Sequence, residues 1–376
     1  MTKNIPGVLA ALAVMLVGFW LADAIGYAIL AAQGLSGSSP VSGVPVAIVL
    51  GLLLRNLVAL PQELTLGLRF ATTTILRAGI VLVGIRLSLF DVLKLGVAGL
   101  PVVLAAIATG LVFVTWFNRR LGLPPRLGTL IAAGTSICGV TAIVSTAPAI
   151  DADEREVAYA VANVVAFGLF GMLVYPYLAH AVLGSSEAIG LFLGTAVHDT
   201  SQVVGAALTY KQMYADDVVL RTATVTKLTR NIFLAVVIPV LTWMHVRESG
   251  SGSRAHDGAA GAARALSWTR YVPGFVLGFL GMAVVRSIGD AMIRRSGVAY
   301  GLLGSGEWNS LIAFAGDTVA SRVLLGTAMA AVGLSTSFSV FRGVGLKPFA
   351  VGFAGAVAVG AMGMLMAVIF GGFVSP

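Results

Sequence analysis

The sequence predicts an all-α polytopic membrane protein with about nine to eleven transmembrane segments, and its composition and its long apolar runs carry this prediction. Of the 376 residues, 58% are hydrophobic and 11% are charged, whereas soluble domains carry roughly 25% charged residues. A membrane-spanning helix needs roughly 20 predominantly apolar residues, and the chain has enough of them for that number of spans. The composition excludes a soluble enzyme, a disordered protein and an ordinary nucleic-acid binder. We therefore expect the lipid bilayer as surroundings and no nucleic-acid partner.

Apolar runs bounded by glycine or charged residues define the expected segments. They fall near 6–32, 44–60, 66–88, 96–118, 127–149, 156–183, 187–209, 219–245, 271–288, 309–340 and 346–373. The first run is too long for the apolar region of a signal peptide, so we expect it to be the first span. The stretch 246–269 is rich in Ser, Gly and Ala, which is typical of a flexible loop. Residues 1–376 are thus expected to form a single transmembrane transporter domain.

The charged and metal-binding residues set further limits. Lys and Arg number 24 and Asp and Glu 16, a formal charge of +8, which fits basic loops held on the cytoplasmic side. Cys138 is the only cysteine and the four histidines are far apart in sequence. An intramolecular disulfide and a CxxC metal or redox motif are therefore excluded. We expect no metal site, no cofactor and no enzymatic activity.

Two similar motifs indicate an internal repeat. The sequence from Gly134 to Gly139, GTSICG, recurs in form from Gly194 to Asp199, GTAVHD. Together with weaker matches, this predicts a first repeat over 44–183 and a second over 187–373. If the segments at 127–149 and 187–209 are broken or re-entrant helices, the two repeats have inverted topology, a known transporter design. Full spans at both places are the alternative, with eleven crossings.

The first motif places glycines and hydroxyls where backbone would lie at membrane depth. Non-helical backbone is tolerated there only against protein or a water-filled cavity. Helix N-terminal N–H groups and hydroxyls can bind an anion, so we predict a substrate site that includes Thr135, Ser136, Cys138, Gly139 and Thr141. The alternative is a small-residue face for helix packing.

The second motif contains five consecutive polar residues, 198–202, between apolar flanks. An ionised carboxylate at the bilayer centre costs roughly 3 kcal/mol on insertion scales, which favours a functional role over a simple loop. Ser201 and Gln202 are predicted to bind substrate. His198 and Asp199 are predicted to couple transport to an ion, because histidine titrates in the physiological range and its charge depends on burial and on a neighbouring carboxylate.

Three polar residues share one face of the following helix. Lys227, Arg230 and Asn231 are spaced i, i+3 and i+4, and a long apolar run follows them. We predict that they bind an oxyanion, because an anion leaving water needs compensating charge. The alternative is that the two cations snorkel to the end of the helix.

These motifs also resemble a known family. GIRLS at 84–88, SICG at 136–139, HDTSQVV at 198–204 and KLTR at 227–230 occur in the order found in the YeiH-like bacterial inner-membrane proteins, a family named for sulfate export. The resemblance covers nearly the whole chain. It departs from the family at Asp199, where we expect Glu, and at Thr200 and Ser201, where we expect apolar or small residues.

The resemblance implies a multi-pass protein of the bacterial inner membrane with a fold similar to the crossed-helix secondary transporters. It implies an exporter of a small oxyanion, sulfate or a related sulfur anion, with H⁺ or Na⁺ as coupling ion. A homodimer stays open. Likeness of fold alone does not fix a substrate.

Three alternatives remain beside an oxyanion transporter. One is a Na⁺-coupled symporter of a small organic anion. The second is a membrane-embedded enzyme that uses His198 and Asp199 as acid and base, although the motif offers no second carboxylate or metal-ligand set. The third is a sensor or scaffold, which would leave the polar run at 198–202 without a purpose. No GxxxxGK[ST] sequence occurs, which argues against transport driven by ATP bound to this chain.

Overall fold

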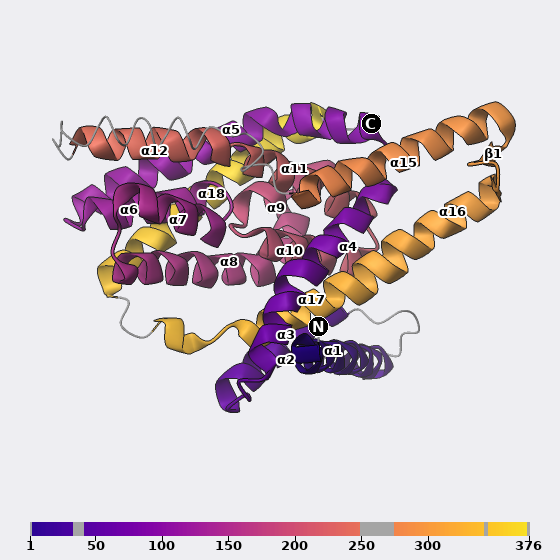
Figure 1. Cartoon of the computed structure of the whole chain (residues 1–376), viewed down its shortest axis with the longest axis horizontal. Helices are drawn as coiled ribbons and strands as arrows, with labels where there is room; N and C mark the ends of the chain where they lie inside the picture. The colour runs from indigo at the N-terminus through magenta and orange to yellow at the C-terminus, as the bar shows by residue number, and fades with distance from the viewer. Residues whose placement is uncertain (1, 33–40, 249–273, 342–344, 374–376) are drawn as a thin grey trace. The chain divides into compact units, whose positions relative to one another are not determined.

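The computed structural model describes residues 2–32, 41–248, 274–341 and 345–373, and these residues are almost entirely helical (Figure 1). Eight helices in this part are long and apolar enough to cross a membrane by length and composition. They are Ile5–Ala32, Leu64–Arg86, Leu89–Arg120, Glu154–Val182, Asp217–Leu241, Gly274–Ser296, Ser305–Ser335 and Leu346–Phe370. Two shorter apolar helical segments are Gly43–Leu57 and Val140–Ile150. The predicted all-α polytopic membrane fold is therefore confirmed, while the number of full crossings and the inverted repeats stay predictions.

The described residues form the following α-helices. In chain order they are α1 (Ile5–Ala32), α2 (Gly43–Leu57), α3 (Leu64–Phe70), α4 (Leu76–Val83), α5 (Leu89–Arg120), α6 (Pro125–Ser136), α7 (Val140–Thr146), α8 (Glu154–Val182), α9 (Ser186–Ala196), α10 (Thr200–Tyr214), α11 (Asp217–Ile232), α12 (Leu234–Glu248), α15 (Gly274–Ser296), α16 (Ser305–Ala313), α17 (Gly326–Ser335) and α18 (Leu346–Phe370).

Shorter elements join or extend these helices. The 3₁₀ turns are η1 (Thr2–Asn4), η3 (Gly84–Arg86), η4 (Ala147–Ile150), η6 (Phe338–Phe341) and η7 (Gly371–Phe373), and the π-helical stretches are η2 (Ala71–Ile75) and η5 (Phe314–Leu325). Strands β1 (Val298–Ala299) and β2 (Leu303–Gly304) form an antiparallel pair between α15 and α16. π-Helical turns are rare overall, and those that occur are often located at functional sites.

Each of the predicted apolar runs is helical in the structure over most of its length. One boundary differs from the expectation. The flexible loop was expected to begin at residue 246, but α12 continues to Glu248. The helix that begins in the apolar run thus continues for a few residues beyond the end of that run. Residues 249–269 of the predicted loop lie outside the described residues.

The chain divides into two compact units. This division does not test the predicted single transporter domain or the predicted repeats over 44–183 and 187–373. The first unit contains Met1–Lys94, Val204–Arg221 and Gly274–Phe338, and the second contains Leu95–Val203, Thr222–Pro273 and Ser339–Pro376. In the first unit, α2 packs against α1 and α17, and α4 packs against α15 and η5. The backbone of α2 comes close to α17 at Gly51, where a Cβ atom would lie 2.8 Å from the Ala330 carbonyl oxygen.

The second unit is built around the two segments that carry the glycine motifs. Helix α6 packs against α7, α8 and α18, and α9 packs against α8 and α18. Apolar side chains of α6, α8 and α18 form one buried cluster, and those of α5, α6 and α12 form another. These contacts hold the ends of α6 and α9 inside the unit, away from lipid and water.

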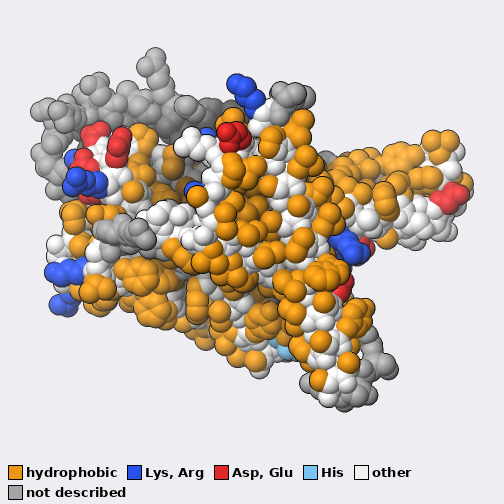
Figure 2. Space-filling model, turned by 90° about the horizontal axis from the view of Figure 1, so that it is seen from below, with side chains coloured by type: hydrophobic (Ala, Val, Ile, Leu, Met, Phe, Trp, Pro, Cys, Tyr) orange, Lys and Arg blue, Asp and Glu red, His pale blue; other side chains and the backbone are white. Residues whose placement is uncertain are grey.

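The molecular surface fits a lipid environment. Many large apolar side chains are exposed, among them Trp20, Phe90 and Val112 at 68%, 73% and 70%. Figure 2 shows one face on which hydrophobic side chains predominate and charged side chains are confined to small groups. Exposed apolar patches of this extent are rare on monomeric soluble proteins.

Candidate functional site at the interrupted helices

The two motif segments are both broken helices, and the breaks fall at matching motif positions. Helix α6 ends at Ser136 and α7 begins at Val140, while α9 ends at Ala196 and α10 begins at Thr200. In each case three residues separate the two helices. The expectation that both segments are broken is confirmed, and whether they re-enter the same side of the membrane stays a prediction.

Gly139 is the residue that lets the first segment break and restart. Its φ angle is 73°, in the region that residues with a Cβ atom rarely adopt. Its N–H donates to the Gly134 carbonyl oxygen at 3.1 Å, which closes the end of α6. A Cβ atom at this position would lie 3.1 Å from the Asp199 carboxylate. The missing side chain therefore also allows Asp199 of the second break to reach the first.

Lys227 of α11 lies at the point where the two breaks meet. The residue is fully buried. Its ammonium group donates to the carbonyl oxygens of Ile137 at 2.9 Å and Val197 at 3.2 Å, and also to that of His198. All three donors of the ammonium group are therefore directed at backbone carbonyls of the two breaks.

Arg230 lies one turn further along the same face of α11 and is also fully buried. Its guanidinium group donates from Nε to the Ser136 carbonyl oxygen at 2.7 Å and from Nη2 to the Thr135 carbonyl oxygen. Its Nη1 donates to the Thr195 carbonyl oxygen at 2.6 Å. One side chain thus binds the last turns of both α6 and α9.

These contacts give the two cations a clear electrostatic role. The last four carbonyl groups of a helix have no partner within the helix, and the C-terminal end carries about −0.5 elementary charge. Lys227 and Arg230 satisfy such carbonyls at both ends. Two full positive charges face roughly one negative charge from the two helix ends, which leaves an excess of about one positive charge in a buried place.

Close packing of α11 against α9 brings these cations into position. A Cβ atom at Gly194 would lie 2.7 Å from the Thr226 side chain and 2.9 Å from the Ala223 carbonyl oxygen. The absence of a side chain at this position allows the two helices to approach closely, as small residues do at helix contacts in membranes. Thr226 directly precedes Lys227. The contact between Gly194 and Thr226 therefore fixes the position of Lys227 along the α11 axis, so that its ammonium group lies at the breaks.

Asp199 caps the N-terminus of α10. Its Oδ1 accepts hydrogen bonds from the Ser201 N–H at 2.9 Å and from the Ser201 hydroxyl at 2.6 Å, as expected for an aspartate at the N-cap position. The N-terminal end of a helix is positive and favours such an anion. Asp199 is also close enough to Lys227 to interact electrostatically. The carboxylate is thus the negative charge that balances the excess at the breaks.

Gln202 connects this turn to α8. Its Oε1 accepts from the Asp199 N–H at 3.1 Å, and its Nε2 donates to the Val165 carbonyl oxygen at 3.3 Å. Its side chain packs where Gly168 of α8 has no side chain. Both polar ends of Gln202 are therefore used within the protein.

We call the place where the breaks at 137–139 and 197–199 meet the crossing. Three buried polar groups at the crossing have no hydrogen-bond partner among the described residues. They are the Ser136 hydroxyl, His198 Nδ1 and Asn231 Oδ1. Asn231 donates from Nδ2 to the Thr200 hydroxyl at 3.2 Å. Since buried polar groups are nearly always paired, each exception needs an explanation. Here the three groups belong to residues on or next to the segments that Lys227 and Arg230 contact.

The structure brings together all but one of the predicted site residues. Thr135, Ser136, Cys138, His198 and Gln202 are buried, as are Gly139, Lys227, Arg230 and Asn231, while Asp199 and Ser201 are partly buried. Thr141 is exposed instead, because it lies on the outer face of α7, so it is not brought to the buried crossing. Thr195 and Thr200, which the sequence argument did not include in the site, contribute a carbonyl and a hydroxyl. The available signal was that Thr195 lies within the second glycine motif and Thr200 within the polar run 198–202.

A second charged centre lies in the first unit. Arg86 binds Asp217 at 2.8 Å and Asp317 at 2.5 Å, and Lys211 binds the same two carboxylates at 2.7 Å and 2.5 Å. Four side chains from four elements therefore form a closed ring of alternating charge, and Arg221 adds a further contact to Asp217 at 3.1 Å. Sequence reasoning missed this ring, because its four members come from four separate segments of the chain.

Comparison with known proteins places the chain among membrane proteins. A family model described as "Conserved hypothetical protein 698" matches residues 6–352. A UPF0324 membrane protein of Streptococcus pneumoniae is 35% identical over 66% of this chain and 70% of its own. One from Ralstonia nicotianae is 35% identical over 72% and 74%, and one from Bacillus cereus is 31% identical over 87% and 86%.

Proposed function

Because the chain belongs to the UPF0324 family of membrane proteins, of which the YeiH-like proteins are part, we propose that it is a secondary-active transporter of a small oxyanion, such as sulfate or a related sulfur anion. The observation that carries the proposal is the pair of buried cations at the crossing of two broken helices. Lys227 and Arg230 are fully buried, and within the described residues neither forms an ion pair with a carboxylate. Buried charges in membrane proteins mark substrate and ion pathways by default.

The excess positive charge would attract an anion to the crossing. The two helix C-termini supply about one negative charge against the two cations, and Asp199 supplies the other. A carboxylate that leaves this place, or that becomes neutral, uncovers about one positive charge. An oxyanion can replace it there, because the unpaired hydroxyl of Ser136 and the hydroxyl of Ser201 can donate to its oxygens.

Competition between Asp199 and the substrate would couple transport to protons. A proton bound to Asp199 removes the built-in negative charge and favours anion binding, and deprotonation favours anion release. The anion and the proton would then move together, as in a symport. We place the proton on Asp199 rather than on His198 because Asp199 is partly exposed, whereas His198 is buried.

Broken helices supply the flexibility that alternating access requires. Discontinuous helices near the bilayer midplane form the sites of many secondary transporters. The three-residue breaks at 137–139 and 197–199 interrupt two helices at equivalent points, so short half-helices can change their angle without breaking a continuous hydrogen-bond ladder. The absence of a GxxxxGK[ST] sequence fits transport that uses an ion gradient instead of ATP.

Reconstitution into proteoliposomes tests this function. Uptake and efflux of labelled sulfate, sulfite, thiosulfate and a small sulfonate would be measured with an imposed pH gradient, with a Na⁺ gradient and with neither. We expect at least one sulfur oxyanion to move faster with the pH gradient than without it. Movement of organic anions only with Na⁺ would favour the Na⁺-coupled symporter. No movement of any anion under any gradient would refute the proposal.

Asp199→Asn provides the sharper arm of the experiment. Asparagine caps a helix about as well as aspartate, so the fold should be retained, while the charge that titrates is lost. We expect Asp199→Asn to exchange the anion but to lose acceleration by the pH gradient. Asp151→Asn is the matched control, because Asp151 is exposed and its φ of 49° suits asparagine. Retained gradient response in Asp199→Asn would exclude Asp199 as the coupling residue.

A further inference from the structure

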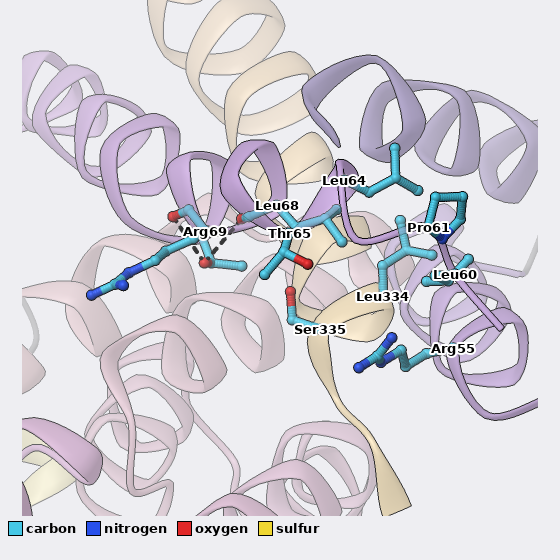
Figure 3. Close-up of a pocket in the computed structure, with 10 residues that line it drawn as sticks. Arg55, Leu60, Pro61, Leu64, Thr65, Leu68, Arg69, Leu334 and Ser335 are labelled. Atoms are coloured by element: carbon cyan, nitrogen blue, oxygen red, sulfur yellow. Dashed lines mark hydrogen bonds between the residues drawn. The ribbon is translucent and has the colours of Figure 1, made fainter. Parts of the chain in front are cut away.

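A cavity of about 240 Å³ lies within the first unit at the ends of α2 and α17 and the beginning of α3 (Figure 3). It is separate in sequence from all residues of the crossing. The cavity is lined by five apolar and five polar residues, namely Leu60, Pro61, Leu64, Leu68, Leu334, Arg55, Arg69, Thr65, Thr72 and Ser335. Thr65, Arg69 and Ser335 are exposed, so the cavity opens to the surface.

The lining is positively charged. It contains two arginines and no carboxylate. Within the described residues, neither Arg55 nor Arg69 takes part in an ion pair, and the Nε atom of Arg55 is buried without a hydrogen-bond partner. An unpaired buried N–H of a charged group destabilises the folded protein. An oxyanion that accepts from Arg55 would remove this cost.

The polar and apolar parts of the lining are arranged for an amphiphile. In Figure 3 the hydroxyls of Thr65 and Ser335 point toward one another, with the Arg55 guanidinium on the side of Leu334. The Arg69 guanidinium extends away from the other labelled side chains, so its aliphatic stem is the part that lines the cavity. Leucine side chains form the remaining wall. A phosphate can therefore meet a guanidinium and hydroxyls while its neighbouring carbon atoms meet leucines.

The cavity lies at the end of an apolar helix, where lipid headgroups are expected. Arg55 is in the last turn of the apolar helix α2, and the connection to α3 contains Gln62 and Glu63. Arginines at such helix ends reach the membrane–water interface, and basic pockets between membrane helices bind anionic lipid headgroups. Leu57 and Leu66, which are 79% and 53% exposed, leave apolar surface near the lining residues in sequence.

We propose that this cavity binds the phosphate group of an anionic phospholipid, such as phosphatidylglycerol, through Arg55. The cavity has room for the phosphate and part of the glycerol, whereas the acyl chains remain outside on apolar surface. Bound lipid would join the end of α2 to α3 and α17, next to the point where Asn56 already donates to the Thr336 carbonyl oxygen at 3.0 Å.

Native mass spectrometry of the purified protein tests the proposal. The protein in detergent would be titrated with phosphatidylglycerol, with zwitterionic phosphatidylethanolamine and with glycerol 3-phosphate. Arg55→Gln should weaken retention of phosphatidylglycerol at least about tenfold. Arg294→Gln is the matched control, because Arg294 is also in the last turn of a membrane helix of the same unit but does not line the cavity, and we expect it to bind as the wild type does.

A second variant keeps the test decisive if Arg55→Gln does not fold, which gel filtration would show. Ser335→Leu leaves Arg55 intact but fills the cavity, and it should also weaken retention of phosphatidylglycerol. Unchanged retention in a folded variant of either kind would overturn the proposal. Equal retention of phosphatidylethanolamine would overturn the requirement for an anionic lipid. Binding of glycerol 3-phosphate as tight as that of the lipid would assign the cavity to a soluble phosphate ester instead.

Discussion

Replacement of Arg230 by lysine changes the structural and the functional role of this residue in a measurable way. Arg230 donates from Nε to Ser136 at the end of α6 and from Nη1 to Thr195 at the end of α9. The guanidinium group reaches both helices because its donors are fixed in a planar fork. A lysine retains the positive charge but has a single ammonium group, so we expect it to bind the carbonyls of one helix end and to lose those of the other.

The expected loss of stability follows from the number of contacts. A hydrogen bond to a charged group contributes about 1.5–3 kcal/mol. Loss of one or two such bonds at one helix end should therefore destabilise the protein by about 3 kcal/mol. The unit that contains Arg230 comprises Leu95–Val203, Thr222–Pro273 and Ser339–Pro376, which is within the range of 150–250 residues for which 1 kcal/mol shifts the melting temperature by about 2–4 °C. If this unit melts by itself, Arg230→Lys should lower its melting temperature by about 6–12 °C.

Cys138 provides the assay for this decrease. It is the only cysteine of the chain, it lies in the first break, and it is 5% exposed. A thiol-reactive fluorophore should label it only when the crossing opens, so the fluorescence during heating reports unfolding at the site itself. Arg294→Lys, an exposed replacement of the same kind, should melt as the wild type does. An unchanged melting temperature in Arg230→Lys would refute the role of the guanidinium at both helix ends.

Transport by the same variant separates structure from substrate binding. Measured below its melting temperature, Arg230→Lys should transport at least about tenfold more slowly, the effect of about 1.4 kcal/mol. In the proposed function, a point charge would replace a planar group that could bind an oxyanion through two N–H donors after releasing helix-end carbonyls. Lys227→Ala should lose at least as much. Normal transport by a folded Arg230→Lys would restrict Arg230 to holding the helix ends.

Three further predictions concern the charge ring, the topology and the histidine. Asp317→Asn removes one carboxylate of the ring, and because its side chain is 42% exposed we expect a loss of only about 1–2 kcal/mol, measured as a lower melting temperature at low salt. The exposed Glu63→Gln is the control, and equal melting of both variants would contradict a role of the ring. Ala152→Cys in a Cys138→Ser background should resist an impermeant thiol reagent added outside intact cells, and labelling would instead favour eleven full spans. His198→Gln should bind and transport the anion and still respond to a pH gradient. Loss of that response with binding retained would make His198 the coupling residue.

The fold could be predicted from the sequence to the level of its helical segments. Membrane helices need long apolar runs. In this sequence, which is 58% hydrophobic, glycines and charged residues mark where each run begins and ends. The two breaks could be predicted as well, because Gly139 and the polar run that begins at His198 oppose a continuous helix at that depth. The π-helical stretches could not be predicted, since a single extra residue in a helical turn leaves no clear pattern.

The charge ring shows why contacts between distant segments were missed. Lys211 and Asp317 are 106 residues apart, and Arg86 and Asp317 are 231 residues apart. Each of these residues alone resembles an ordinary charge near the end of a helix. Only the folded structure shows that two cations share the same two carboxylates, so no local pattern could have identified the ring.

Lys227 and Arg230 show a different limit. Their i, i+3 spacing within an apolar context was sufficient to select them as buried cations, and the structure confirms that burial. Their partners could not be predicted, because every residue carries a backbone carbonyl and only the positions of the breaks decide which carbonyls are free. The sequence argument therefore selected two side chains that the structure shows to be buried, but it considered only a substrate as their partner.

The need to hold two broken helices together and the proposed anion binding have the same physical origin. A helix that ends inside the membrane exposes carbonyls that water cannot satisfy, and the protein meets this need with two cations. Because two full charges exceed the partial charges of the two helix ends, the structural solution leaves positive charge in a buried place. Asp199 at the start of α10 compensates for this charge within the protein. A neutral Asp199 would uncover it, so the same contacts that stabilise the breaks would make the site selective for anions.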